Sequence, residues 1–238
     1  MSQETILQEI CEVGRAIHRQ GFVAANSGNI SVRLEDGSVW VTPTGVSKGD
    51  ITPDSLVHID LEGRRLEPGP GEASSETKMH LAAYRADPEI RAVVHTHSRA
   101  ATYLSMFGEE LSDPISADII LQVGNIPVAP YAELGTQELA EGIGALAPEY
   151  HAALLQNHGV VVFGRTLREA YYRAEAVENY CALLCLCRMG KREPRRLTRQ
   201  EVAALLAKRW TMPQGHKGGV PKTEKNGAQT ERSNEEFQ

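Results

Sequence analysis

The chain has few aromatic residues, and it lacks long hydrophobic stretches. Only 5% of its 238 residues are Phe, Trp or Tyr, so the core must be built mostly from Val, Leu, Ile and Ala. No apolar stretch reaches the roughly 20 residues that span a membrane, and the first residues have neither the basic region nor the apolar core of a signal peptide. We therefore expect a cytoplasmic protein with no membrane association.

Cysteine is also scarce, and its placement gives no metal-binding motif. Cys181, Cys185 and Cys187 cluster on one predicted helix, and Cys11 stands alone. A metal site at the cluster would need further ligands nearby, and the sequence offers none. We interpret the four cysteines as buried free thiols.

Positive charge is in deficit, with 25 Lys and Arg against 31 Asp and Glu and a net charge of -6. This balance argues against a general nucleic-acid surface, although a local site could still hold a small phosphorylated substrate. The length suits one large domain, which we predict over residues 1–212. Residues 213–238 are rich in Gly, Lys, Glu, Asn and Gln, and this composition predicts a flexible polar tail.

Hydrophobic periodicity and turn signals predict helices that alternate with short strands. The expected helices cover residues 2–20, 74–86, 98–107, 136–147, 166–188 and 198–210, and the expected strands cover 30–34, 39–41, 56–59, 92–94, 126–131, 153–156 and 160–163. Prolines in the segment 126–131 indicate an edge strand, and the segment 115–123 is ambiguous.

Residues 74–97 carry the most specific chemical signal. His95 and His97 lie at the end of a predicted strand, where residues two apart project to the same face. His158, in the turn between two later strands, could supply a third imidazole, and Glu76 could supply an oxygen. Three imidazoles and one carboxylate suit a divalent ion, with Zn²⁺ expected and Mn²⁺ or Co²⁺ as alternatives.

Each part of this pattern also has a simpler explanation. A lone H-x-H motif is a weak metal signal, and Glu76 would suit any helix start because of the helix dipole. His80 either supports the site or is a core histidine with one satisfied nitrogen, and we favour the core residue. His18 and His58 are expected to face solvent. The combination of the four candidate ligands, in contrast, favours a metal site.

Two loops of small and hydroxyl-bearing residues flank the first predicted hairpin. The segments A-A-N-S-G-N at 24–29 and T-P-T-G at 42–45 allow close backbone approach to a ligand, but each alone is more often an ordinary turn. Ser74 or Ser75 is a natural N-cap of the helix that follows. The free amides of such a helix start attract anions.

Six motifs occur in the order S-G-N-I-S, T-P-T-G, S-S-E-x-x-x-H, V-V-H-T-H, A-P-Y-A-E-L-G-T and L-L-Q-N-H-G. With them the chain resembles the class II aldolase/adducin family over roughly residues 5–190. The resemblance implies a three-layer α/β/α fold with a mostly antiparallel central sheet. It also implies a homotetramer with active sites between adjacent subunits.

The resemblance assigns roles to individual residues. It implies that His95, His97 and His158 bind the metal and that Glu76 is the acid/base and, in some states, a fourth ligand. The positions that hold the substrate phosphate in the family, through neutral donors and backbone amides, match Asn29, Thr44, Gly45, Ser74 and Ser75.

The implied reaction is metal-dependent aldolase cleavage of a small phosphorylated sugar. A ketose 1-phosphate, of the fuculose or 5-deoxypentulose type, would give dihydroxyacetone phosphate and an aldehyde through a metal-stabilised enediolate. Two tyrosines that fuculose-phosphate aldolases use on the aldehyde side are missing: about Ser116 stands in the place of one, and no tyrosine follows Tyr180.

The same residues could serve a phosphosugar epimerase, a dehydratase or a sugar-acid-phosphate decarboxylase. The Ser74–Ser75 pair resembles the aldolase version of the motif, whereas the epimerases more often have Asp at the acid position. A non-catalytic, adducin-like binding protein is disfavoured, because Glu76 and the three histidines are all present.

Overall fold

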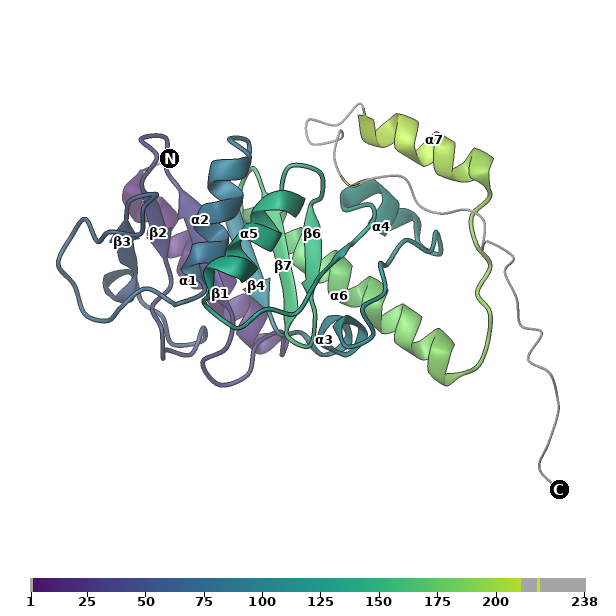
Figure 1. The fold of residues 1–238 in the computed structure, drawn as a ribbon, viewed down its shortest axis with the longest axis horizontal. Helices are drawn as coiled ribbons and strands as arrows, with labels where there is room; N and C mark the ends of the chain where they lie inside the picture. The colour runs from purple at the N-terminus through teal and green to yellow at the C-terminus, as the bar shows by residue number, and fades with distance from the viewer. Residues whose placement is uncertain (1, 211–217, 219–238) are drawn as a thin grey trace, which may run out of the picture.

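The computed structural model describes residues 2–210 and Gly218, so nearly all of the predicted polar tail lies outside the described residues. One seven-stranded sheet organises the part that is described, in the order β3-β2-β1-β4-β7-β6-β5 (Figure 1). The strands are β1 Asn29–Arg33, β2 Val39–Val41, β3 Val57–Ile59, β4 Ala92–Thr96, β5 Val128–Ala129, β6 Ala152–Leu155 and β7 Gly159–Gly164. Only β5 and β6 pair in parallel, so the predicted mostly antiparallel sheet is confirmed.

Both faces of the sheet are buried, and successive side chains alternate between them. On three central strands one face carries Val94, Leu154 and Val162 and the other carries Val93, Ala153 and Val161. Period-2 alternation with apolar residues on both faces requires a helical layer on each side. The three-layer α/β/α arrangement is therefore the physical consequence of these short apolar strands.

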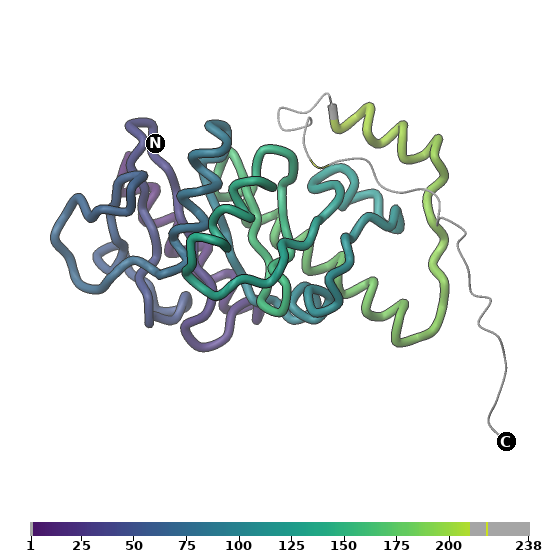
Figure 2. The backbone as a smooth tube through the Cα atoms, viewed as in Figure 1, coloured from purple at the N-terminus to yellow at the C-terminus, as the bar shows by residue number. Residues whose placement is uncertain are grey.

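Two sets of helices supply the outer layers. On the first face, the strands contact α1 Gln3–Arg19, α3 Arg99–Ser105 and α6 Leu167–Met189, while α4 Ala117–Gln122 packs on α6 and α7 Arg199–Trp210 packs on α4. The second face packs against α2 Thr77–Ala86 and α5 Gln137–Leu146, which lie in front of the sheet in Figure 1. A short 3-10 helix, η1, covers Pro53–Ser55. The N-terminus and α7 lie toward opposite ends of the long axis (Figure 2).

Local signals set most helix boundaries where the sequence places them. Ser2 caps α1 through its side chain, and Gly21, with φ of 72°, follows its end. Thr166 caps α6, and Thr198 forms a capping box with Glu201 at the start of α7. The ambiguous segment 115–123 contains the short helix α4.

The predicted helix at 74–86 begins three residues later than expected. Ser74 does not cap it: the Ser74 hydroxyl accepts the amide of Glu76, and the Ser74 carbonyl accepts the amide of Thr77. These bonds close a turn, so Glu76 occupies the N-cap position instead of the first helical turn. Hydroxyl side chains bind nearby backbone amides in this way and compete with the helix.

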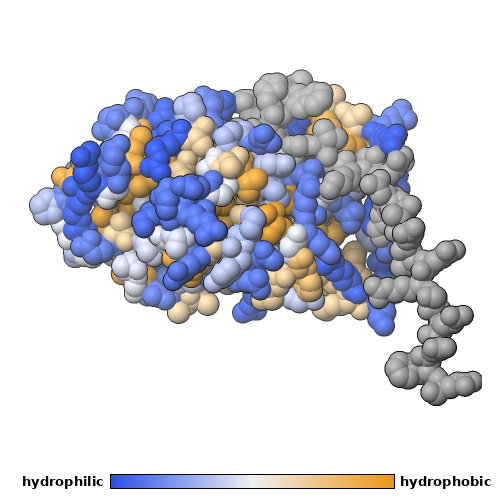
Figure 3. Space-filling view, viewed as in Figure 1, coloured by the Kyte–Doolittle hydropathy of each residue, from blue (hydrophilic) through white to orange (hydrophobic). Residues whose placement is uncertain are grey.

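The cysteine and surface predictions have mixed outcomes. Cys11 and Cys181 are buried as expected, whereas Cys185, which packs against the edge of the core, and Cys187 are only partly buried. Hydrophilic residues cover most of the face shown in Figure 3. Within the described residues, no helix combines the length and the apolar character needed to cross a bilayer.

Candidate active site

His95 lies on β4 and His97 directly follows it. Their side chains project to the same side of the strand, because residues two apart on a strand face the same way. The two Nε2 atoms lie 2.9 Å apart. His95 is fully buried, and its Nδ1 donates to the carbonyl oxygen of Val160 on β7 at 2.9 Å. Because a carbonyl can only accept, this bond places the proton on Nδ1 and leaves the lone pair of His95 at Nε2.

The third imidazole comes from the tight turn between β6 and β7. Asn157 occupies the left-handed region, with φ of 58°, and turns the chain so that His158 faces β4. Gly159, the first residue of β7, allows the chain to lie close against β4, since a Cβ there would stand 2.4 Å from the carbonyl oxygen of Thr96. The three imidazole rings therefore meet edge to face, with centroids 4.7 to 4.8 Å apart.

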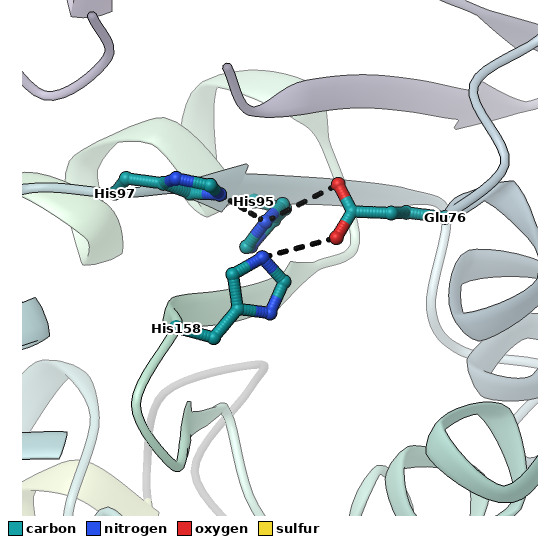
Figure 4. Close-up of side chains that lie close together, drawn as sticks. All are labelled: Glu76, His95, His97 and His158. Carbon is teal, nitrogen blue, oxygen red and sulfur yellow. Dashed lines mark hydrogen bonds and ion pairs between the residues drawn. The ribbon is translucent and has the colours of Figure 1, made fainter. Parts of the chain in front are cut away.

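Glu76 approaches this group from the start of α2 (Figure 4). Its Oε1 lies 3.0 Å from Nε2 of His158, and its Oε2 lies 3.5 Å from Nε2 of His95. Asn29, at the start of β1, donates from Nδ2 to Oε2 at 2.8 Å and to the Ser74 hydroxyl at 3.2 Å. Asn29 therefore orients the carboxylate toward the imidazoles.

Burial sets the protonation of these groups. It lowers the pKa of His95 to about 3 and that of His97 to about 4, although Glu76 opposes both shifts. Burial would raise the pKa of Glu76, but His158, His95 and the Asn29 amide outweigh it and hold that pKa well below the usual range. Near pH 7, His95 and His97 are thus neutral and Glu76 is ionised.

This donor set fits a divalent ion. One donor atom from each of Glu76, His95, His97 and His158 lies within 4.8 Å of every other. Four ligands about 2 Å from a tetrahedral ion would be roughly 3.3 Å apart, and three of the six separations, at 2.9, 3.0 and 3.5 Å, lie close to that value. Nε2 of His158 and Oε1 of Glu76 are moreover buried and face each other, with no further hydrogen-bond partner among the described residues, which is compatible with a cation between them.

The predicted phosphate-binding residues converge on the same place. A cavity of about 210 Å³ is lined by eight of the nine predicted site residues: Asn29, Thr44, Gly45, Ser74, Ser75, Glu76, His97 and His158. The ninth, His95, is fully buried and touches both His97 and His158. Asn29 Nδ2 donates to Glu76 and Ser74, whereas its Oδ1 is buried with no hydrogen-bond partner among the described residues.

Sequence reasoning missed Lys48, which also lines this cavity. Lys48 is only 1% exposed, and a lysine so deeply buried is unusual. The sole signal was its position three residues after the T-P-T-G loop, and loops have no periodicity from which burial can be predicted.

The other histidines in the described part of the chain lie outside the cluster. His80 is fully buried, and its Nδ1 lies 2.7 Å from the Ser31 hydroxyl, which in turn lies 2.6 Å from the Tyr84 hydroxyl. The predicted core histidine with one satisfied nitrogen is thereby confirmed, since Nε2 has no hydrogen-bond partner. His18 is exposed as predicted, but the ring of His58 is largely covered because it stacks on Trp40 at 4.3 Å.

The chain belongs to the class II aldolase/adducin family. The sequence profile of the Class II Aldolase and Adducin N-terminal domain matches residues 8–185, which contain the whole cluster and the cavity lining. The predicted family and the predicted fold are thus both confirmed.

Curated relatives of comparable similarity carry out two different reactions. The chain is 35% identical over 208 residues to 3-oxo-tetronate 4-phosphate decarboxylase of Pectobacterium atrosepticum, covering 86% of this chain and 94% of the relative. It is 34% identical over 212 residues to L-fuculose phosphate aldolase of Escherichia coli K12, covering 87% and 95%.

Two solved structures are similar to this chain: YgbL, described as a putative aldolase/epimerase/decarboxylase, and an L-fuculose 1-phosphate aldolase. YgbL of Klebsiella pneumoniae superposes with a TM-score of 0.81 at 33% identity, covering 86% of this chain and 99% of the other. An L-fuculose 1-phosphate aldolase superposes with a TM-score of 0.80 at 28% identity, covering 89% and 99%. Fold similarity alone therefore does not select the reaction.

Proposed function

We propose that this chain is a divalent-metal-dependent lyase that cleaves a carbon–carbon bond in a phosphorylated sugar acid and releases dihydroxyacetone phosphate. The substrate class is a 3-oxo sugar acid phosphate, of which 3-oxo-tetronate 4-phosphate is the simplest candidate. Similarity to the Pectobacterium decarboxylase supports this class. The cluster of Glu76 with three histidines beside a hydroxyl-lined cavity supports the chemistry.

The observation that carries decarboxylation over aldol cleavage is the composition of the cavity. No tyrosine is among the described residues that line it, and Tyr131, close in sequence to the lining residue Leu134, is 62% exposed. Aldol cleavage must remove a proton from the hydroxyl of the carbon that becomes the aldehyde. Loss of CO₂ has no such requirement, because the leaving group carries no proton once its carboxylate is ionised.

The bond changes are simple for this substrate. The bond between C1 and C2 breaks, its electron pair stays on C2 and delocalises onto the oxygen at C3, and C1 leaves as CO₂. A proton delivered to C2 then gives dihydroxyacetone phosphate. A divalent ion held by His95, His97 and His158, and by Glu76 in the states in which that carboxylate does not carry the proton, would supply Lewis-acid stabilisation of the developing oxygen charge.

The chain's own residues hold the reacting groups. Asn29 donates to Oε2 of Glu76, so Oε1 is the oxygen that can take up a proton from water and pass it to the substrate carbon. Thr44, Gly45, Ser74 and Ser75 line the cavity near Glu76 and offer hydroxyl and amide donors for the phosphate. Because residues 74–77 form a turn and Ser74 does not cap α2, Ser74 and Ser75 line the cavity.

Aldol cleavage of a ketose 1-phosphate is the second candidate. The Ser74–Ser75 pair, which resembles the aldolase form of the motif, and the similarity to the Escherichia coli aldolase favour it. Both reactions would leave the same three-carbon enediolate, so the same Glu76 and the same phosphate contacts would serve each.

The test is a coupled assay of dihydroxyacetone phosphate on two sets of substrates. One set contains 3-oxo-tetronate 4-phosphates, and the other contains fuculose, ribulose and 5-deoxyribulose 1-phosphates. The protein is loaded with Zn²⁺, Mn²⁺ or Co²⁺ in parallel, and Glu76→Gln protein is the blank. Release of CO₂ with dihydroxyacetone phosphate supports the decarboxylase, whereas an aldehyde co-product moves the assignment to the aldolase.

We include the homotetramer with shared sites in this proposal. Leu134, which lines the cavity, is 53% exposed, and Tyr131 beside it is more exposed still. Burial of these side chains against a neighbouring subunit would complete the open side of the cavity. Light scattering of the purified protein measures the mass, and a monomer with full activity would contradict this part.

A further inference from the structure

Lys48 lies at the meeting point of the two loops that flank the first hairpin. Its ammonium donates to the carbonyl oxygen of Asn26 at 3.1 Å and to that of Val46 at 2.7 Å. Asn26 belongs to the loop before β1, and Val46 follows the T-P-T-G loop after β2. Lys48 therefore ties together two segments that both line the cavity.

The Lys48 ammonium can donate one more hydrogen bond than the described residues accept. It carries three N–H groups, and the described residues supply acceptors to two of them. No carboxylate forms an ion pair with it within the described part of the chain. Burial of a cation without a paired anion costs free energy, so such a residue needs a compensating partner.

The charge of the cavity identifies that partner. Among its described lining residues, Lys48 is the single cation and Glu76 the single anion, and Glu76 is directed at the imidazoles. The remaining donors near Thr44, Gly45 and Ser74 are neutral. An anion that enters between the two loops would thus meet one positive charge. Loops that offer hydroxyl and amide donors beside a positive charge are suited to bind a phosphate dianion.

We propose that Lys48 is the positioning residue of the phosphate subsite: it holds the two loops in register and supplies the positive charge that selects a phosphorylated substrate. This inference rests on the proposed function for its substrate class, but it is a statement about phosphate binding and not about the reaction. It replaces the expectation that neutral donors alone bind the phosphate.

The position of the charge also suits decarboxylation. A cation beside the leaving carboxylate would stabilise the ground state and oppose loss of CO₂. A cation at the opposite, phosphate end binds the substrate equally in the ground state and the transition state. Loss of Lys48 should therefore raise KM more than it lowers kcat.

The experiment compares Lys48→Gln, Lys48→Arg and Lys78→Gln in the full-length, metal-loaded protein. Lys78 is an exposed lysine on α2, so its variant removes the same charge close to the site without touching the cavity. Calorimetry measures the Kd of inorganic phosphate, thermal unfolding measures Tm, and elemental analysis measures metal content. KM and kcat are measured on the best substrate of the assay above.

We expect Lys48→Gln to weaken phosphate binding by about tenfold or more, as loss of a charge-assisted hydrogen bond implies. Lys48→Arg should stay within about threefold and Lys78→Gln within about twofold of the wild type, since both keep the buried charge. If Lys48→Gln lowered Tm but left the Kd of phosphate unchanged, Lys48 would have only a structural role, and the proposal would be overturned.

A second measurement covers the case in which Lys48→Gln does not fold. Wild-type protein labelled at the lysine ε-carbon is titrated with inorganic phosphate, and the Lys48 resonance is identified by its absence from Lys48→Arg protein. A saturable shift of that resonance supports the proposal, and no shift contradicts it. If the protein released no dihydroxyacetone phosphate but still bound phosphate in a way that depends on Lys48, the proposed reaction would be wrong and this inference would stand.

Discussion

Asn29 and Glu76 are joined by a hydrogen bond of 2.8 Å between Nδ2 and Oε2, across 47 residues of sequence. The bond connects the first residue of β1 to the N-cap of α2. Asn29 also pairs with His95 in the antiparallel register of β1 and β4. The Asn29 side chain thus fixes the Glu76 carboxylate relative to β4, the strand that positions His95 and His97.

Glu76→Gln should lower kcat by about 10²- to 10⁴-fold, the range for loss of a positioned acid or base. The glutamine keeps the shape of the side chain but cannot carry the proton. Metal content should fall less than activity, because the three imidazoles remain. Steady-state kinetics and elemental analysis on the same preparations measure both quantities.

The exposed Glu72, in the loop before this site, provides a matched control. Glu72→Gln should retain the activity of the wild type. Glu76→Gln protein with unchanged kcat would exclude Glu76 as the proton carrier.

Alanine at His95, His97 or His158 should reduce metal content and lower kcat/KM by more than about 100-fold. Loss of a residue that only hydrogen-bonds to a metal ligand already lowers activity by up to about 100-fold, and loss of the ligand itself should cost more. Chelation of the wild type should have the same effect and should lower Tm, since the ion binds the folded state alone. His18→Ala, at an exposed position, is the control. Full metal occupancy in all three variants would disprove the assignment of the ligands.

His80 should make stability depend on pH. Burial lowers its pKa to about 4 in the folded protein, against about 6.5 in the unfolded chain. Above pH 6.5 the imidazole is neutral in both states, and below it the unfolded chain gains the proton first, so the free energy of unfolding falls as the pH falls toward 4. The loss attributable to His80 is about 3 kcal/mol.

The measurement is urea unfolding of chelated wild-type and His80→Gln protein between pH 7 and pH 4, so that metal release makes no contribution. The difference between the two free energies should shrink across this window. A constant difference would show that His80 does not titrate on unfolding.

Gly28→Ala should destabilise the protein more than Gly37→Ala. Both glycines have positive φ, of 70° and 89°, and alanine there costs about 1–2 kcal/mol in either case. A Cβ at Gly28 would in addition lie 2.7 Å from the carbonyl oxygen of His95, whereas none meets an atom within 4 Å at Gly37. Gly28→Ala should therefore also lower metal affinity. Equal losses in urea unfolding, with unchanged metal content, would contradict this account.

Patterns local in sequence predicted most of the elements. Period-2 apolar strands and helix caps such as those at Thr166 and Thr198 depend on interactions over a few residues, so they can be recognised in the sequence itself. The start of α2 was wrong because Ser74 has two uses for its hydroxyl, and only the surrounding loops decide between a helix cap and a turn.

The sequence by itself determined that this protein has a sheet covered on both faces and four candidate ligands, because strand periodicity and residue chemistry are properties of short segments. Only the tertiary structure decided what surrounds those ligands. It turned Asn29 toward Glu76, covered His58 with Trp40 and buried Lys48 between two loops. Each of these contacts joins segments whose approach depends on strand order and register, and neither property can be derived from the residues of one segment alone.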